Sequence, residues 1–316
     1  MEQEVISIII PCYNEEQVLG LFYKEYKKVR SVMTEVSFEL ILVDDGSTDR
    51  TFEIIQEISE TDESVKYISF SRNFGKEAAM YAGMEVAVGD YVVIMDADLQ
   101  DPPSLLPEMF RIIKEEGYDS VATRRVSRKG EPKIRSLFAR TFYKLMNHIS
   151  TTDIVDGARD YRLMTRKFVD SLLSLSEYNR FSKGLFGWVG FRTKWLEYEN
   201  VERAAGETKW SFWKLFRYSI EGIVAFSTVP LAISSFLGVI MCFLSMIFIL
   251  FIILRQLIYG GSVAGWSSMI CIIMFIGGIQ LLGIGILGLY LSRTYLEVKK
   301  RPIYISKETN IETAKA

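Results

Sequence analysis

Residues Asp90-Tyr-Val-Val-Ile-Met-Asp-Ala-Asp-Leu-Gln-Asp101 give the strongest structural indication in the chain. The short apolar run 91–95 is bounded by polar residues on both sides, which is typical of a buried strand in a parallel sheet. Two carboxylates, Asp96 and Asp98, follow the run directly. Because they are two residues apart, they lie on one side of the chain at the carboxyl edge of the sheet, where open α/β folds bind ligands.

The pair of Asp96 and Asp98 is suited to hold a hard divalent cation. Mg²⁺ or Mn²⁺ takes a few carboxylate oxygens and completes its coordination with water and the oxygens of a diphosphate. A solvated acidic turn that closes the strand is the alternative for an isolated pair of this kind. The polar loops after the neighbouring strands favour the metal site over that turn.

Three more strands are predicted before this element. Apolar runs at 5–10, 38–43 and 65–70 alternate with helical patterns, among them 16–33 and 77–88. This alternation predicts a largely parallel sheet with helices on both faces. The chain contains neither a Gly-x-Gly-x-x-Gly nor a P-loop pattern, which argues against a dinucleotide dehydrogenase or a P-loop kinase.

Polar loops follow all four strands, at residues 11–15, 44–49, 72–76 and 96–101. In a parallel sheet these loops converge on one edge. Acids alone would repel a nucleotide sugar, so a metal has to bridge them to the diphosphate. We therefore expect a metal ion bound at this edge of the sheet.

Individual residues in these loops suit different parts of a nucleotide sugar. Asp44 or Asp45 is placed to accept hydrogen bonds from a base or ribose, and Lys76 is placed to meet a phosphate. For the second loop, a helix N-cap at Ser47 or Thr48 is the structural alternative. That alternative explains poorly why two acids end a strand.

Composition limits the kind of protein. The chain has 316 residues, of which 49% are hydrophobic, and a net charge of −2, so its charge indicates no nucleic-acid partner. Its three cysteines lack metal-like spacing and fit a reducing compartment. Glu2 and Glu4 stand where a signal peptide would be basic, so we expect no cleaved leader and a cytoplasmic first domain.

The apolar excess lies in two segments near the end of the chain. Residues 230–254 and 267–291 are uncharged, and at about 1.5 Å per residue each is long enough to cross a bilayer core of about 30 Å. Before them, residues 203–222 interleave aromatic rings with Lys and Arg, which predicts an interfacial helix; a core-packing helix is the alternative. The glycine-rich second segment suits close helix contact, within the hairpin or between copies in a homo-oligomer.

Charge placement predicts the topology. The loop between the two segments carries one charge, Arg255, whereas four basic residues follow the second segment, so both termini are expected in the cytoplasm. We expect four parts: a cytoplasmic catalytic domain (1–202), an interfacial segment (203–227), a transmembrane hairpin (228–292) and a cytoplasmic tail (293–316). The tail is expected to be frayed after Pro302.

Four motifs together carry a family resemblance. Pro11-x-Tyr-Asn-Glu15, Asp44-Asp-Gly-Ser-x-Asp49, Arg72-Asn-x-Gly-Lys76 and Asp96-Ala-Asp-Leu-Gln-Asp-Pro-Pro103 resemble those of the family-two glycosyltransferases with a GT-A fold. More narrowly, the chain is similar to polyprenyl-phosphate hexosyltransferases, namely bactoprenol glucosyltransferases and dolichol-phosphate mannose synthases. This implies a GT-A type α/β fold, with a mostly parallel sheet and flanking helices, an interfacial helix and two transmembrane helices.

The resemblance implies a role for each matching position. The nucleotide sugar would be bound by Pro11, Tyr13, Asn14, Glu15, Asp44, Asp45, Lys76 and Asp96. Mg²⁺ or Mn²⁺ would be held by Asp96, Asp98 and Gln100. The catalytic groups would be the carboxylate of Asp160 and the basic side chains of Arg124, Arg135 and Lys209. The segment Gly157-Ala-Arg159 departs from the small residues that usually precede the catalytic aspartate.

The implied reaction transfers a hexose from a UDP-sugar to undecaprenyl phosphate at a bacterial plasma membrane. A lipid monophosphate is largely dianionic at neutral pH, because its second pKa is about 6, so its oxygen needs little help from a base. UDP-glucose is the first choice of donor, followed by UDP-N-acetylglucosamine and GDP-mannose. A processive polysaccharide synthase and a non-catalytic sugar-nucleotide sensor or scaffold are the alternatives; two membrane spans are too few for the synthase.

Overall fold

The computed structural model describes residues 3–125, 155, 157–198, 220, 222–259 and 265–311. It divides the chain into two compact units, Met1–Ser219 with Arg301–Ala316, and Ile220–Lys300. The strands are β1 (Val5–Cys12), β2 (Ser37–Asp44), β3 (Val65–Phe70), β4 (Tyr91–Ile94), β5 (Ser120–Arg125), β6 (Ala158–Thr165), β7 (Thr193–Tyr198) and β8 (Ser306–Thr309). The helices are α1 (Leu19–Val32), α2 (Thr51–Thr61), α3 (Lys76–Val86), α4 (Leu106–Glu116), α6 (Arg166–Leu173), α7 (Ser182–Trp188), α9 (Val229–Tyr259) and α10 (Trp266–Val298), with a short 3-10 turn, η1 (Pro103–Leu105).

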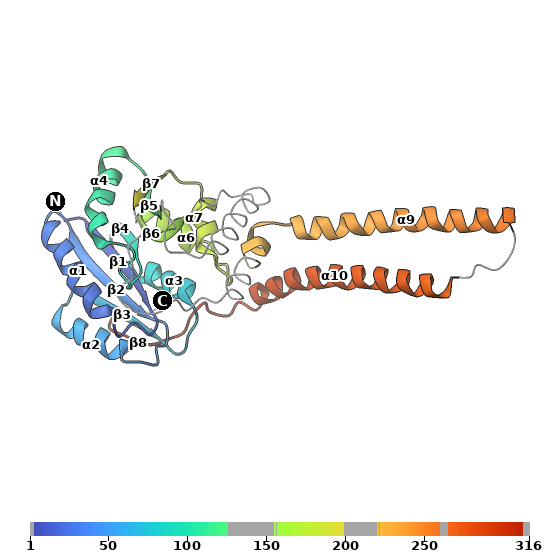
Figure 1. Cartoon of the computed structure of the whole chain (residues 1–316). Helices are drawn as coiled ribbons and strands as arrows, with labels where there is room; N and C mark the ends of the chain where they lie inside the picture. The colour runs from blue at the N-terminus through green and yellow to red at the C-terminus, as the bar shows by residue number, and fades with distance from the viewer. Residues whose placement is uncertain are drawn as a thin grey trace. The chain divides into compact units, whose positions relative to one another are not determined.

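The first unit is built on one eight-stranded sheet in the order β7-β5-β6-β4-β1-β2-β3-β8 (Figure 1). The pairs β1–β2, β1–β4, β2–β3 and β5–β7 are parallel. β6 runs antiparallel between β4 and β5, and β8 runs antiparallel to β3. The predicted α/β fold with a mostly parallel sheet is confirmed, and β4 begins at Tyr91 as the sequence indicates.

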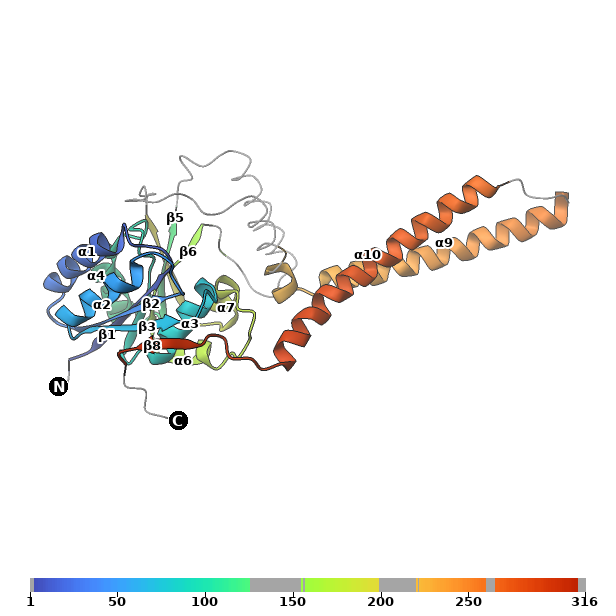
Figure 2. The same cartoon turned by 90° about the horizontal axis from the view of Figure 1, so that it is seen from below.

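Helices cover both faces of the sheet (Figure 2). On one face, α1, α2 and α4 bury side chains such as Phe22, Ile55 and Met109 against the strands in one hydrophobic cluster. On the other face, α3 packs against β1 so closely that a Cβ on Gly83 would lie 2.3 Å from Ile9 Cγ2. The small residues of α3 therefore allow a close helix–sheet contact that positions the start of this helix at the sheet's edge.

The end of the chain corrects one expectation. We expected a frayed tail after Pro302, but within the described residues β8 pairs with β3. The physical reason is that β3 would otherwise be an edge strand with unpaired backbone groups. The tail has a polar composition and therefore gives no strand pattern in the sequence, because an edge strand that faces solvent needs few apolar side chains.

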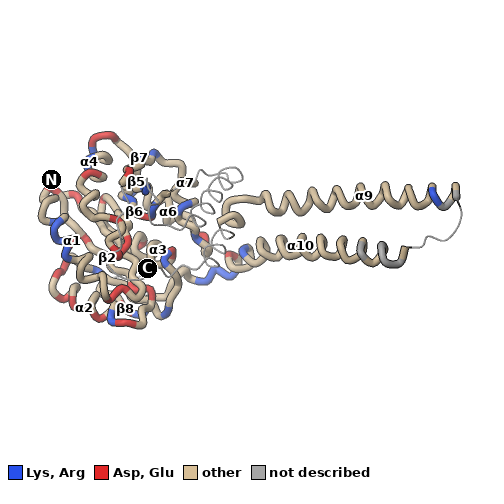
Figure 3. Tube along the Cα trace, in the orientation of Figure 1, with Lys and Arg blue, Asp and Glu red and all other residues tan. Residues whose placement is uncertain are grey.

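The second unit contains the two apolar helices. Within α9 and α10, the segments Val229–Arg255 and Ile272–Val298 have mean hydropathies of 3.1 and 2.3, and none of their most apolar stretch is buried. Both are long and apolar enough to cross a membrane, which indicates membrane association. Figure 3 shows the helices almost free of charged residues. They run further than expected, to Tyr259 and Val298, so each helix continues past its apolar run into residues that include Arg255, Arg293 and Glu297.

Candidate active site

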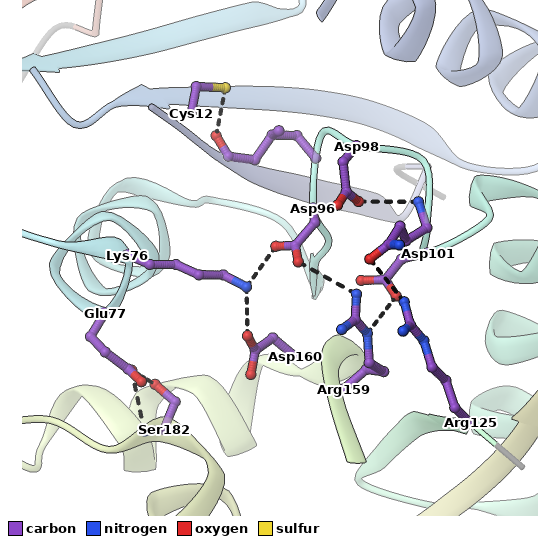
Figure 4. Close-up of polar contacts among 12 residues, drawn as sticks. Cys12, Lys76, Glu77, Asp96, Asp98, Asp101, Arg125, Arg159, Asp160 and Ser182 are labelled. Carbon is purple, nitrogen blue, oxygen red and sulfur yellow. Dashed lines mark hydrogen bonds and ion pairs between the residues drawn. The ribbon is translucent and has the colours of Figure 1, made fainter. Parts of the chain in front are cut away.

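A lysine between two carboxylates lies at the centre of the candidate active site (Figure 4). Lys76 is the first residue of α3, Asp96 follows β4, and Asp160 lies in β6. The Lys76 Nζ atom is 2.6 Å from Asp96 Oδ1 and 2.6 Å from Asp160 Oδ2. The carboxyl ends of β3 and β4 converge as predicted, and the antiparallel β6 adds a third contributor that the sequence pattern does not foresee.

The charges of this cluster stabilise one another. Burial by itself raises the pKa of Asp160, but Lys76 and Lys183 outweigh it and hold the pKa below its usual range. Burial lowers the pKa of Lys76, yet Asp160 and Asp96 raise it above its usual value. At neutral pH Asp160 is therefore a carboxylate and Lys76 an ammonium.

A second, buried cluster adjoins Asp96. Asp101 is fully buried, and its Oδ1 accepts hydrogen bonds from Arg159 Nε at 3.1 Å and from the Tyr198 hydroxyl at 2.8 Å. Arg159 Nη2 also lies 3.8 Å from Asp96 Oδ2. Burial raises the pKa of Asp101, and Arg159 opposes that rise. Arg159 thus supplies a cation that contacts both clusters.

The predicted metal ligands lie on the turn that follows β4. Asp98 Oδ1 accepts a hydrogen bond from the backbone amide of Gln100 at 3.1 Å, and the side-chain Oε1 of Gln100 accepts one from Arg125 Nη2 at 3.0 Å. Within the described ranges, no group of three His, Cys, Asp or Glu side chains is placed to hold a metal ion. Asp96 and Asp98 supply carboxylate oxygens, the kind of ligand that Mg²⁺ and Mn²⁺ prefer.

The loops predicted to bind the nucleoside are held together by their own hydrogen bonds. Asn14 Oδ1 accepts from the Thr48 amide at 2.8 Å, and the Glu15 amide donates to Thr51 Oγ1 at 2.7 Å. These bonds join the loop after β1 to the loop after β2. Tyr13 is partly exposed on the same loop, where it is accessible to a ligand.

Both acids at the end of β2 are buried. Asp44 accepts from the Ser47 amide at 3.0 Å and from the Ser69 hydroxyl at 2.8 Å. Asp45 Oδ1 accepts from the Phe74 amide at 2.6 Å, and burial raises the pKa of Asp45 to about 6. The two carboxylates therefore hold the turn after β2 and the loop after β3 in place through buried hydrogen bonds.

The N-cap alternative for this loop is wrong. Helix α2 begins at Thr51, and its N-cap residue is Arg50, whose side chain makes no capping hydrogen bond. Asp44 instead uses Ser47 to close its own turn.

The basic residues divide into two groups. Arg124 donates to Glu197 on β7, with its Nε 3.0 Å from Glu197 Oε1. The next residue, Arg125, points instead toward Gln100 and Tyr198. Two other expected catalytic residues, Arg135 and Lys209, lie outside the described residues, as does most of the expected interfacial segment, 203–219 and 221.

Helix α7 contributes groups that sequence reasoning missed. Glu77 accepts hydrogen bonds from the Ser182 hydroxyl and from the Ser182 amide, the latter at 3.2 Å. Burial and the nearby Asp160 raise the pKa of Glu77 to about 7. Lys183, the next residue, acts electrostatically on Asp160. No local pattern indicates this, because α7 follows α3 by about a hundred residues.

A buried arginine fixes α7 against the sheet. Arg162 is only 3% exposed, and its guanidinium lies 4.2 Å from the centre of the Phe186 ring and 5.6 Å from that of Trp195. Burial lowers its pKa to about 9, so the side chain still carries its charge at neutral pH. Arg162 is two residues from Asp160 on the same strand and hence on the same face.

Comparison with known proteins identifies the family. The model of glycosyl transferase family 2 matches residues 7–173, and the chain belongs to this family. It is 47% identical to the putative glycosyltransferase CsbB of Bacillus subtilis (strain 168), over 98% of this chain and 94% of that protein. It is 41% identical to the prophage bactoprenol glucosyl transferase homolog of Escherichia coli (strain K12), over 96% and 98%.

One solved structure in the comparison is glucosyl-3-phosphoglycerate synthase from Mycobacterium tuberculosis in complex with Mn²⁺, UDP-glucose and phosphoglyceric acid. It matches with a TM-score of 0.45 at 21% identity, over 70% of this chain and 78% of that chain. The family assignment confirms the resemblance drawn from the motifs, and this protein is a glycosyltransferase.

Proposed function

We propose that this glycosyltransferase transfers a hexose from a nucleotide sugar, in first place UDP-glucose, to undecaprenyl phosphate. The observation that carries the proposal is the Lys76 ammonium held between Asp96 and Asp160, beside the acidic turn at the strand edge. The relatives named bactoprenol glucosyl transferase support a polyprenyl-phosphate acceptor. The two apolar helices support it as well, since such an acceptor lies in a membrane.

The donor would lie across the ends of β1, β2 and β4. The loop 11–15 and the turn after β2 would contact the nucleoside, and Asp96, Asp98 and Gln100 would hold Mg²⁺ or Mn²⁺ near the diphosphate. When bound, such an ion neutralises the charge of a departing diphosphate. Lys76 adds a positive charge on the same side.

In the transfer step, an oxygen of the acceptor phosphate attacks the anomeric carbon of the sugar and forms the new C–O bond. The bond from that carbon to the diphosphate breaks on the opposite face, and its electron pair leaves with the nucleoside diphosphate. The anomeric configuration is therefore inverted. No proton has to move, because the acceptor is already largely dianionic at neutral pH.

The chemistry of Asp160 follows from its charge partners. A carboxylate whose pKa lies below the usual range is a weak base at neutral pH, and the acceptor needs none. We therefore assign to Asp160 the orientation of Lys76 and of the reacting sugar, with electrostatic stabilisation of positive charge at the anomeric carbon. Arg124, Arg135 and Lys209 would hold the acceptor phosphate and the leaving group.

The membrane arrangement is part of the proposal. Both apolar helices would span the plasma membrane of a bacterium, with the catalytic unit and both termini in the cytoplasm. The basic residues in the last turns of the second helix and just after it, Arg293, Lys299, Lys300 and Arg301, support this orientation. A reporter enzyme that is active only outside the cytoplasm should be inactive when fused after Ala316.

Transfer by the purified full-length protein in detergent tests the function. Labelled UDP-glucose, UDP-N-acetylglucosamine and GDP-mannose are each offered with undecaprenyl phosphate, with and without EDTA. We expect a labelled lipid product from one donor, its loss with EDTA and its recovery with Mg²⁺. A matched pair of variants tests the site: Asp160→Asn should lower transfer about a hundredfold, whereas Asp170→Asn, at an exposed position on α6, should not.

Nucleotide binding without transfer to any lipid would contradict the proposal and favour a sugar-nucleotide sensor. Transfer by Asp160→Asn at the wild-type rate would be compatible with the proposed reaction but would contradict the role assigned to Asp160.

A further inference from the structure

The chain that returns from the second apolar helix ends as a strap on the sheet. We define the C-terminal strap as residues 302–311. Its strand β8 pairs Thr309 with Ile68 and Ser306 with Phe70. Farther along, Asn310 Oδ1 accepts from the Tyr67 amide at 2.7 Å, and Asn310 Nδ2 donates to the Val65 carbonyl at 3.1 Å. The strap therefore covers the whole length of β3.

The other end of the strap lies beside the loop that leads to the site. The half-buried Tyr304 ring stacks on Phe70, with centroids 4.9 Å apart and planes 24° apart. The Tyr304 hydroxyl donates to Glu85 of α3 at 2.7 Å. The Ser71 amide donates to the Ile305 carbonyl at 3.0 Å. Tyr304 thus contacts both β3, the strand before the loop 71–76, and α3, the helix after it.

The contacts continue from Phe70 into the donor loop, residues 71–76. The Phe74 ring meets the edge of Phe70 with centroids 5.7 Å apart. The amides of Phe74 and Gly75 donate to the buried Asp45. Gly75 has a φ of 101°, a conformation that favours glycine, and the next residue is Lys76. A continuous set of packed groups therefore joins Tyr304 to the lysine at the centre of the site.

We propose that Tyr304 is a positioning residue for the donor site, through which the C-terminal strap holds the loop 71–76 and places Lys76 between its carboxylates. Since the strap directly follows α10 in sequence, the donor site is completed only after the membrane helices have been made. The effect on donor binding rests on the proposed function, whereas the effect on the loop does not.

A simpler role for the strap is to cover the edge of β3. That role predicts equal effects from losing a contact at either end, because every residue of the strap would only add stability. A positioning role predicts instead that the effect on the loop 71–76 depends on where in the strap the contact is lost. Tyr304 lies next to the donor loop, whereas Asn310 contacts the start of β3, and both lie in the same strap.

Three variants of the full-length protein separate the two roles: Tyr304→Ala, Tyr304→Phe and the matched control Asn310→Ala. Hydrogen exchange at the backbone amides is followed by mass spectrometry. Because Tyr304→Ala removes the ring that stacks on Phe70, it should speed exchange in 71–76 about threefold to tenfold. Tyr304→Phe keeps the ring and should stay close to wild type there. Asn310→Ala should speed exchange only around residues 65–67.

Binding of UDP with Mg²⁺, measured by calorimetry in detergent, is the second readout. Tyr304→Ala should weaken it about threefold to tenfold, and Asn310→Ala should leave it unchanged. If Tyr304→Ala and Asn310→Ala speed exchange in 71–76 equally, or neither does, the positioning role is overturned. If the wild-type protein binds no nucleotide, the proposed function fails, and the exchange data still decide whether the strap holds the loop.

Discussion

Replacing Lys76 by Met tests the central ion cluster most directly. The substitution keeps a chain of similar length and removes the ammonium that lies 2.6 Å from both Asp96 and Asp160. Two carboxylates then face each other without the cation that lay between them, although Arg159 stays beside Asp96. The expected result is a repulsion that depends on pH, because protonation of either acid removes it.

The magnitude follows from the geometry. Both oxygens lie 2.6 Å from one nitrogen, so they are within about 5 Å of each other, and the repulsion is about 1–3 kcal/mol for effective dielectric constants between about 80 and 20. The lower part of that range applies, since the Lys76 side chain is 39% exposed and solvent screens it. At about 2–4 °C per kcal/mol for a domain of this size, the loss in Tm at pH 7 is about 2–8 °C.

The direction of the pH dependence is the sharper test. In the wild-type protein the pKa of Asp160 is lowered, so its contribution to stability is present above the unfolded pKa and is lost as pH falls below it. In Lys76→Met the folded pKa values rise above the unfolded ones. The cluster then loses stability as pH rises from about 4 to 7.

Thermal unfolding of the purified protein, followed by tryptophan fluorescence from pH 4.5 to 7.5, measures both effects. Lys114→Met is the matched control, because Lys114 pairs with the single carboxylate of Glu4 at 2.8 Å and its side chain is 44% exposed. It should change Tm by less than Lys76→Met and should not alter the pH trend. Equal curves for the two variants would show that Lys76 does not couple Asp96 to Asp160.

Three further perturbations have definite expected outcomes. Arg124→Gln should reduce transfer about tenfold, because Arg124 is proposed to hold the acceptor phosphate, and Arg125→Gln should reduce it as well, because Arg125 donates to Gln100 on the metal-site turn; kcat/KM for the two variants checks this, and an unchanged kcat/KM in Arg124→Gln would contradict the role proposed for Arg124. The folded pKa of Glu77 is raised to about 7, so the wild-type protein loses stability as pH rises from about 4.5 to 7. Glu77→Gln should remove this loss. Unfolding at pH 5 and pH 8 measures the change in stability between the two pH values, and the same change in the variant as in the wild type would contradict the prediction. Gly83→Ala should destabilise by about 1–3 kcal/mol, since the new methyl would overlap Ile9, and an unaltered Tm would mean that α3 can shift freely.

Much of this molecule is encoded in local pattern. Alternating apolar runs and amphipathic helices predict the sheet, because each strand and helix must bury its own apolar face. The acids after β4 indicate a ligand site together with the polar loops that follow the neighbouring strands, because these loops meet at one edge of a parallel sheet. The two apolar helices need no tertiary information at all, because their length and composition alone suit a bilayer.

Other features depend on residues that meet only in the folded chain. Lys76 and Asp160 are 84 residues apart, and no periodicity relates them. β8 pairs with β3 across 241 residues, because an exposed strand edge needs a partner and the polar tail supplies one. Arg124 and Arg125 are neighbours in sequence, yet a register shift between Ala122 and Arg124 and the pleat of β5 send them in different directions. Sequence pattern fixes which face of an element is buried, whereas the partners across that face follow from topology.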